Sequence, residues 1–294
     1  MLQVRAGHRA IVAVNARASG FRDPEEMLAS VLAATEGAGV DVGGVVTDGE
    51  DDLREAIDAA DGGRLILVGG DGSVHFALNE ATGPIEIGLV PMGRANNIAR
   101  SLGLPRDVPR AVRVAVTAEA RPVDVLRVET PERSLYGIEG VSAGLHAAAR
   151  MRYDAPDSGH LLEGVTAFAG ALAAYEPWHL ELDLDGRPAY DGDAAGVFLS
   201  NFPLFAYGFK IDPRADIADG RLAAVVLEAE SRHRVVRLVV SAYRGTLRGR
   251  RNVTVAPARE AVLTAPVPMV CDSEVLGTTT ASVRVEQGKL SIAA

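Results

Sequence analysis

Apolar and polar positions alternate in blocks along the first 130 residues. Mainly apolar runs occur at 10–15, 42–47, 64–68 and 85–91. Between them apolar residues recur at a spacing of three or four, as Leu28 and Val31 do after Pro24. Short runs without polar alternation are typical of strands buried on both faces. The pattern therefore predicts an α/β domain with a mainly parallel sheet and helices on both sides.

From about residue 122 the pattern changes to short strand-like runs. These runs lie at 122–129, 134–144, 179–186, 194–202 and 221–230. Helical patterns interrupt them at 159–175 and 232–248, and turn-forming sequences follow at 185–188 (DGRP) and 286–289 (EQGK). Many short strands separated by turns predict a β-rich, sandwich-like second domain.

Composition narrows the class of protein. The 294 residues are 48% hydrophobic and 23% charged, which is typical of globular domains. A net charge of -9 argues against nucleic acid as the main partner. Cys271 is the single cysteine, which excludes an intrachain disulfide and fits a reducing cytoplasm. We also expect no signal peptide, because the first apolar run is too short for one.

The sequence GGDGS at 69–73 follows one of the buried runs and precedes a helical pattern. A strand, a glycine-rich loop and a helix together direct backbone N–H groups at an anion, and glycines let a phosphate approach closely. We expect Ser73 to be the N-cap of this helix. The alternative is a hairpin turn, since Asp-Gly also suits hairpins. The apolar run before the loop favours a phosphate-binding loop.

A second loop of the same kind lies at 91–105, PMGRANNIARSLGLP. It again follows a buried run, has a glycine at the turn and opens a helix. Ligands of parallel sheets bind beyond the carboxyl ends of the strands, so both loops are expected at one site. Of the 30 basic residues 28 are arginines, so a cationic phosphate contact is expected to be an arginine. Arg94 is the candidate in this loop, and the alternative is a solvated surface residue.

These motifs resemble those of the diacylglycerol-kinase-like lipid kinases of bacteria, whose relatives include sphingosine and ceramide kinases and, more distantly, NAD kinases. The resemblance covers nearly the whole chain. Its segments occur in the family's order: NARASG (15–20), GGDGS (69–73), PMGRANN (91–97), VSAGLHA (141–147), SNFPLFAYGFKIDPRADIADGRL (200–222) and CDSEVL (271–276).

The resemblance implies an ATP-binding domain at 1–128, to which about 277–294 return, and a β-rich lipid-substrate domain at 129–276. It implies ATP and Mg²⁺ as cofactors. The expected nucleotide contacts are Asn15, Thr47, Gly69, Gly70, Asp71, Gly72, Ser73, Val74, His75, Gly93, Arg94 and Asn96.

Two metal sites follow from the same resemblance. Asp71 is the expected Mg²⁺ ligand or its holder through water, and the alternative is a turn residue that caps its own loop. A second, structural Mg²⁺ is expected at Asp216, Asp219 and the carbonyl of Arg221. The alternative there is an ordinary Asp-Gly turn between strands.

Asp272 and Glu274 are the expected catalytic acids. At a spacing of two, both would project to one face of a strand. By resemblance this segment supplies the general base, and we favour Glu274 for it, with Asp272 orienting Glu274 or the metal. The alternative is an acidic turn between strands.

The chain also departs from the family's motifs. Arg94 replaces a threonine, Asn97 replaces an aspartate, and Ser273 replaces the glycine of a D-G-E sequence. The predicted function is an ATP-dependent lipid kinase acting on a diacylglycerol-like or sphingoid-like lipid. The alternatives are an NAD kinase-like enzyme and a nucleotide-binding regulatory protein without turnover.

The expected partner is a lipid at a membrane surface. We expect a cytoplasmic monomer or homodimer that contacts the inner face of the membrane transiently. The stretch 231–251 offers a means. Read as a helix, it has Arg234, Arg237, Arg244 and Arg248 along one side and Val235, Val239, Tyr243 and Leu247 along another. The alternative is a core-packed helix with a solvated basic side.

Overall fold

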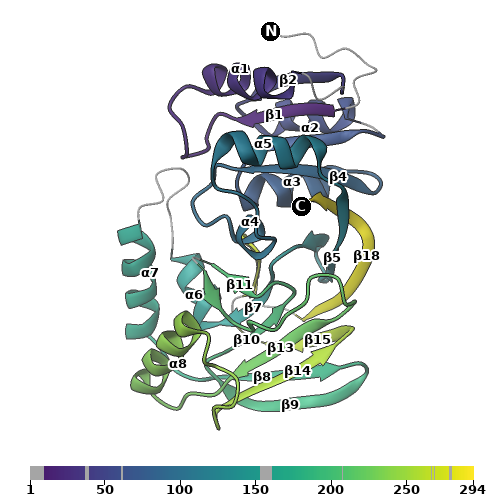
Figure 1. Cartoon of the computed structure of the whole chain (residues 1–294). Coiled ribbons are helices and arrows are strands. Elements are labelled where there is room, and N and C mark those ends of the chain that lie inside the picture. The colour runs from purple at the N-terminus through teal and green to yellow at the C-terminus, as the bar shows by residue number, and fades with distance from the viewer. Residues whose placement is uncertain are drawn as a thin grey trace. The chain divides into compact units, whose positions relative to one another are not determined.

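The computed structural model (Figure 1) describes residues 10–36, 40–60, 62–152, 161–206, 208–265, 267, 269–277 and 280–294. The expectations for residues 1–9 and for 159–160 lie outside this part of the chain. The structure divides into two compact units. Unit 1 is Met1–Val123 with Gln287–Ala294, and unit 2 is Asp124–Glu286.

Unit 1 contains a parallel sheet. Its strands are β1 (Ala10–Asn15), β2 (Val42–Thr47), β3 (Arg64–Gly69), β4 (Ile85–Pro91) and the end of β18 (Ala281–Ala293), in the order β2-β1-β3-β4-β18. Each neighbouring pair is parallel. β1 and β3 are buried over nearly their whole length, so the prediction from their apolar runs is confirmed.

Helices cover both faces of this sheet. α1 (Pro24–Thr35) packs with α5 (Val108–Thr117), and α2 (Glu50–Ala59) packs with α3 (Asp71–Glu80). The short α4 (Asn97–Ser101) follows β4. Local chemistry sets the helix starts: the Asp23 carboxylate accepts the N–H groups of Glu25 and Glu26 at 2.9 and 3.1 Å, and Pro24 occupies the first turn of α1.

Unit 2 is a sandwich of two sheets. One consists of β14 (Val253–Ala258), β13 (Leu222–Leu227), β10 (Gly196–Ser200), β7 (Gly140–Gly144), β16 (Met269–Cys271) and β17 (Glu274–Gly277). The other contains β5 (Ala120–Glu129), β6 (Ser134–Gly137), β8 (Trp178–Leu184), β9 (Arg187–Ala194), β15 (Glu260–Thr264) and the start of β18. Leu182 and Leu263 of one sheet and Val197 and Val226 of the other belong to one buried cluster. The predicted α/β plus β-rich fold class is confirmed.

Three helices cover the outer face of the six-stranded sheet of unit 2. They are α6 (Leu145–Met151), α7 (Leu161–Ala173) and α8 (Arg232–Arg244), and their buried residues share a cluster with those of β10 and β13. A small hairpin, β11 (Leu204–Phe205) and β12 (Phe209–Lys210), precedes β13. α8 ends four residues earlier than predicted, because Gly245 has a φ of 69° and closes the helix.

The two predicted turns have different outcomes. Asp185 and Gly186 join β8 to β9 with φ of 50° and 73°, as a two-residue hairpin turn requires. The turn predicted at 286–289 is wrong, since β18 runs through it. Gly288, with a φ of 79°, accommodates the change from antiparallel pairing with β15 to parallel pairing with β4.

Candidate functional site

The carboxyl ends of four strands of unit 1 lie along one edge of the sheet. Asn15 at the end of β1 pairs with Thr47 at the end of β2, and Gly69 at the end of β3 pairs with Pro91 at the end of β4. Because β1 also pairs with β3 in parallel, the loops after these strands emerge at the same edge. This is where parallel α/β sheets bind ligands.

The two glycine loops contact each other at this edge. The N–H groups of Met92 and Gly93 donate to the Gly69 carbonyl at 2.7 and 3.1 Å. A Cβ atom on Gly70 would lie 2.9 Å from the Cα of Gly93, and one on Gly93 would lie 2.5 Å from the Cα of Gly70. Only glycine fits at either position without a shift of the backbone.

The first glycine loop leads directly into α3. The helix begins at Asp71, and Gly70 is the N-cap with extended backbone angles. Gly70 has no side chain to cap the helix, and its carbonyl accepts the N–H groups of Ser73 and Val74 at 3.0 and 3.4 Å. The N–H groups of Asp71 and Gly72 and the positive end of the helix dipole suit an anion. Gly72 is exposed, and a Cβ atom there would have no neighbour within 4 Å.

The prediction that Ser73 is the N-cap is wrong. Ser73 is the third residue of α3 and is buried, and its Oγ accepts a hydrogen bond from Nδ2 of Asn15 at 3.0 Å. The helix starts earlier than predicted because Gly70 adopts the N-cap conformation itself. Ser73 thereby joins the end of β1 to the first turn of α3.

The second loop is held in shape by Asn96. Its φ of 47° is left-handed, its Nδ2 donates to the Gly93 carbonyl at 2.7 Å, and its Oδ1 accepts the Gly93 N–H at 3.0 Å. Arg94 lies between these residues and is exposed. The amide of Asn96 therefore shapes the loop, while Arg94 projects at its surface.

Asp71 connects the two loops. Its Oδ2 accepts the Asn97 N–H at 2.9 Å and its Oδ1 accepts the Ile98 N–H at 3.0 Å. These bonds make the Asp71 carboxylate a cap of α4 in the next loop, which the alternative of a turn residue in its own loop does not account for. A carboxylate is also the kind of ligand that Mg²⁺ prefers, so Asp71 is compatible with a metal ligand.

Three other expected nucleotide contacts are buried in unit 1. Thr47 Oγ1 donates to the Val14 carbonyl at 3.3 Å, which directs this hydroxyl at the backbone of β1. Val74 and His75 are 0% and 6% exposed within α3. The Val74 N–H also donates to the Gly70 carbonyl at 3.4 Å, and His75 lies beyond the first turn of α3, so neither is placed as a direct ligand contact.

Asp272 lies in a turn of unit 2. It has a φ of 49° and stands between the end of β16 and the start of β17. The expectation that Asp272 and Glu274 share one strand is wrong, because this left-handed residue and Ser273 reverse the chain between two strands. The Asp272 carboxylate accepts three backbone N–H groups, from Ile138 at 2.8 Å, Glu139 at 2.9 Å and Gly140 at 3.0 Å.

Glu274 is the first residue of β17, and its carboxylate forms an ion pair with Arg133. Nη2 of Arg133 also donates to the Val275 carbonyl at 2.8 Å. Glu274 and Arg133 are 37% and 41% exposed at their side chains. Asp272 therefore supports the backbone at 138–140, whereas Glu274 has a carboxylate that solvent and a ligand can reach.

Asp216 and Asp219 are exposed in the loop before β13. Asp216 Oδ1 accepts the Ala218 N–H at 3.1 Å, and Asp219 Oδ1 accepts the Arg221 N–H at 2.9 Å. These are the Asp turns of the alternative interpretation. The described residues contain no group of three or more His, Cys, Asp or Glu side chains arranged to hold a metal ion. The oxygen donors of this loop nevertheless match the preference of Mg²⁺.

The sequence interpretation missed Asp124 and Asn201 beside this loop. Asp124 is 2% exposed, and its Oδ2 accepts the Gly220 N–H at 2.6 Å. Nδ2 of Asn201 donates to the carbonyls of Asp124 and Ile138, while Oδ1 of Asn201 is buried without a partner among the described residues. The signal for Asp124 is a carboxylate between two valines in the strand-like run 122–129.

Ser142 and His146 form a second pair that was missed. Ser142 Oγ lies 2.8 Å from Nδ1 of His146, whose ring packs against Phe198 and Phe205. Burial, with a smaller contribution from the charge of Arg150, lowers the pKa of His146 to about 4. His146 is therefore a neutral hydrogen-bonding group at pH 7.

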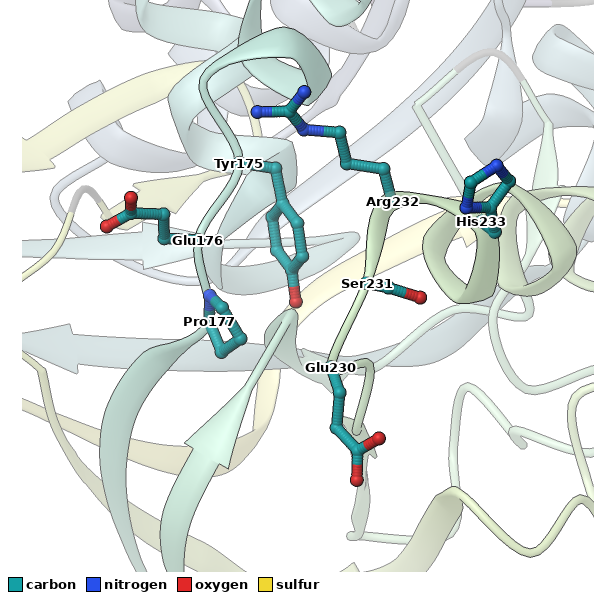
Figure 2. A pocket seen from close by; sticks show the side chains of 7 residues that line it. All are labelled: Tyr175, Glu176, Pro177, Glu230, Ser231, Arg232 and His233. Carbon is teal, nitrogen blue, oxygen red and sulfur yellow. The ribbon is translucent and has the colours of Figure 1, made fainter.

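A surface hollow of about 380 Å³ lies at the start of α8 (Figure 2). Figure 2 shows Tyr175, Glu176 and Pro177 on one segment and Glu230, Ser231, Arg232 and His233 on the other. None of these seven residues is among the expected nucleotide contacts, metal ligands or general base.

Among the described helices, none is both long enough and apolar enough to cross a bilayer.

Comparison with known proteins gives two family matches. Residues 139–294 match the family described as the YegS C-terminal NAD kinase beta sandwich-like domain, which is more than half of the chain. Residues 9–128 match the diacylglycerol kinase catalytic domain. The two matches follow one another along the chain.

Individual proteins agree with these matches. Diacylglycerol kinase of Bacillus subtilis (strain 168) is 27% identical over 240 residues, which are 77% of this chain and 76% of that protein. The crystal structure of a diacylglycerol kinase from Bacillus anthracis (strain Sterne) has a TM-score of 0.71 at 16% identity and covers 98% of both chains. An NAD kinase from Archaeoglobus fulgidus, in complex with ATP, has a TM-score of 0.56 at 11% identity and covers 97% of this chain and 93% of its own.

Proposed function

Since the chain belongs to the family of diacylglycerol-kinase-like lipid kinases, we propose that it transfers the γ-phosphate of ATP to a hydroxyl of a diacylglycerol-like or sphingoid-like lipid. The observation that carries this proposal is the contact between Gly70 and Gly93. The two loops meet at glycines, which have no side chains, at the carboxyl edge of a parallel sheet, and the N-terminus of α3 opens beside them. This arrangement suits a chain of phosphates.

Unit 1 would bind the nucleotide. The first N–H groups of α3 and the exposed Gly72 would contact phosphate oxygens, and the guanidinium of Arg94 would neutralise negative charge. Asn15 and Ser73 would support the first loop through the hydrogen bond between their side chains. Phosphoryl transfer depends mainly on such positioning and charge neutralisation.

Asp71 would hold Mg²⁺ directly or through water, because a carboxylate is the preferred kind of ligand for this ion. The ion supplies charge neutralisation at the phosphates when it is bound. For the second, structural Mg²⁺ we retain Asp216, Asp219 and the Arg221 carbonyl, and we add the buried Asp124, which already binds this loop. Oxygen donors of this kind fit the ion.

Unit 2 would supply the general base. A lipid hydroxyl is a weak nucleophile at neutral pH and requires an acceptor for its proton. Asp272 already accepts three N–H groups, which suits a positioning residue. Glu274 is more accessible, so we propose Glu274 as the base, with Arg133 orienting its carboxylate.

Two alternatives are tested by the same experiment. The likeness to an NAD kinase structure supports NAD as a second acceptor to examine. Asn97, which is 1% exposed in α4, stands where the family has an aspartate and supports nucleotide binding without turnover. The experiment supplies ATP labelled at the γ-phosphate to a panel of diacylglycerols, sphingoid bases and NAD. We expect label in a lipid; label in NAD alone, or tight ATP binding without transfer, would overturn the proposal.

A further inference from the structure

Helix α8 (Figure 1) has buried residues along one side. Val235, Leu238 and Ala242 are at most 4% exposed and pack in the cluster that covers the six-stranded sheet. Successive residues of an α-helix are rotated by about 100°, so these three share one side. The opposite side of α8 faces solvent.

A second apolar row runs along that outer side. Val236, Val240 and Tyr243 are 45%, 43% and 69% exposed, and their spacing of four and three places them on one face. Three of the seven large apolar side chains that are exposed in the described part of the chain thus lie on this helix. A solvated helix face normally carries polar residues at such positions.

This row differs from the stripe predicted from the sequence. That stripe combined Val235, Val239, Tyr243 and Leu247, but Val235 is buried, Tyr243 is exposed, and Leu247 lies beyond the end of the helix. The predicted stripe is therefore wrong, because it joined residues of the inner side to a residue of the outer side.

The outer face is also strongly basic. Residues 231–251 contain seven arginines and no acid, while the whole chain has a net charge of -9. The rest of the chain therefore carries -16. By the helical period, Arg237 and Arg244 lie within about a quarter turn of the row Val236, Val240 and Tyr243. Positive charge is thus concentrated on α8 and the segment that follows it, in an acidic protein.

Two of the seven arginines form ion pairs within unit 2, and Nε of Arg250 donates to the Thr246 carbonyl at 3.2 Å. Arg248 forms an ion pair with the buried Asp212 at 2.6 Å, and Arg234 pairs with Glu230 at 2.9 Å. The expectation that Arg248 lies along the helix is wrong, since it follows the end of α8. Within the described part of the chain no acid pairs with the other five: Arg232, Arg237, Arg244, Arg250 and Arg251.

Neighbouring residues support this face. The rings of Tyr243 and Phe209 pack edge to face with centroids 6.4 Å apart. Lys210, one of only two lysines, is exposed and packs beside Gly245 at the end of α8. The hairpin β11–β12 therefore holds Tyr243 in place and adds a further positive charge.

An anionic membrane surface is the partner that fits this combination. Nucleic acid would use the arginines but would leave the valines in water. A helix that lies in the interface of a bilayer places apolar side chains among the acyl chains and its basic residues at the head groups. Tyrosine, with an apolar ring and a polar hydroxyl, is enriched at that depth.

We propose that the outer face of α8, formed by Val236, Val240 and Tyr243 with Arg237 and Arg244, docks this protein on anionic lipid bilayers. This docking surface deepens the proposed function and rests on it, because the lipid that would accept the phosphate lies in such a bilayer. The docking itself requires neither ATP nor an acceptor lipid.

Binding to vesicles tests this proposal. The full chain is sedimented with vesicles of phosphatidylcholine containing 30% phosphatidylglycerol, and with vesicles of phosphatidylcholine alone. We expect Arg237→Gln with Arg244→Gln to weaken binding about 30-fold, from about 1 kcal/mol for each basic residue. Val236→Ser with Val240→Ser should weaken it at least fivefold. All four residues are exposed, so the melting temperature should not change.

Matched controls are available at exposed positions elsewhere. Arg113→Gln with Arg187→Gln removes the same charge, and Val262→Ser removes an exposed valine from β15. These variants should bind as the parent protein does. Equal binding by all variants, or equal binding to neutral and anionic vesicles, would overturn the docking surface. Phosphorylation of a short-chain, water-soluble diacylglycerol is measured in parallel, so that failure of the proposed kinase activity is distinguished from failure of docking.

Discussion

A Cβ atom on Gly93 would lie 2.5 Å from the Cα of Gly70, so the two glycine loops of unit 1 are in direct contact. Replacing Gly93 by alanine forces these backbones apart. We expect Gly93→Ala to weaken binding of a non-hydrolysable ATP analogue at least tenfold in calorimetric titration, which corresponds to about 1.4 kcal/mol.

Gly83→Ala is the control for this variant. A Cβ atom at Gly83 has no neighbour within 4 Å, so this variant should bind the analogue normally. If Gly93→Ala also keeps the affinity of the parent protein, the contact between the loops has no part in nucleotide binding.

Asp71 has two separable roles in this account, as a cap of α4 and as a ligand of Mg²⁺. Asp71→Ala should lower the free energy of unfolding by about 1 kcal/mol through loss of the cap, and should also abolish the Mg²⁺ dependence of ATP binding. Asp107 caps α5 by accepting the Arg110 N–H at 3.1 Å. Asp107→Ala should show the loss of stability alone. Identical effects of the two variants on ATP binding would remove Asp71 from the metal site.

Glu274 and Asp272 should differ when each is converted to its amide. Glu274→Gln should lower kcat by about 10²–10⁴-fold, as loss of a general base does, without loss of ATP binding. Asp272→Asn should also lower the melting temperature, because an amide cannot accept all three N–H groups of residues 138–140. Glu181→Gln, at an exposed position on β8, is the control. A Glu274→Gln variant with unchanged kcat would place the base elsewhere.

His146 should make stability depend on pH. Burial lowers its pKa from 6.5 to about 4, so between these values the unfolded chain binds a proton that the folded protein does not. Stability is therefore lost as the pH falls from about 6.5 to about 4. The free energy of unfolding is measured in urea at pH 7 and at pH 5. Its decrease between these values should be about 1–2 kcal/mol larger in the parent protein than in His146→Gln. His179→Gln, at an exposed site, should behave as the parent; equal losses in all three proteins would show that His146 is not the group responsible.

The positions of the strands and glycine loops could be predicted from sequence because the signals are local. A strand buried on both faces is apolar over most of its length, as β1 and β3 are, and glycine is required where backbones approach as closely as Gly70 and Gly93 do. The convergence of the loops then follows from the parallel order of the strands.

Other features depend on partners that are distant along the chain. Asp71 caps a helix 26 residues later, and Asp272 accepts N–H groups more than 130 residues earlier. A spacing of two between Asp272 and Glu274 predicts a strand, yet the left-handed backbone of Asp272 makes a turn there. On α8 the sequence contains two apolar rows, and only tertiary packing distinguishes the inner row from the outer one.

The most direct test of the proposed function is the stoichiometry of one reaction. The protein is incubated with Mg²⁺, γ-labelled ATP and a short-chain diacylglycerol, and ADP and labelled lipid are measured together over time. The account predicts one phosphorylated lipid for each ADP, with both products reduced to about the same extent in Glu274→Gln. Formation of ADP without labelled lipid, or of neither product while ATP binds, would contradict it.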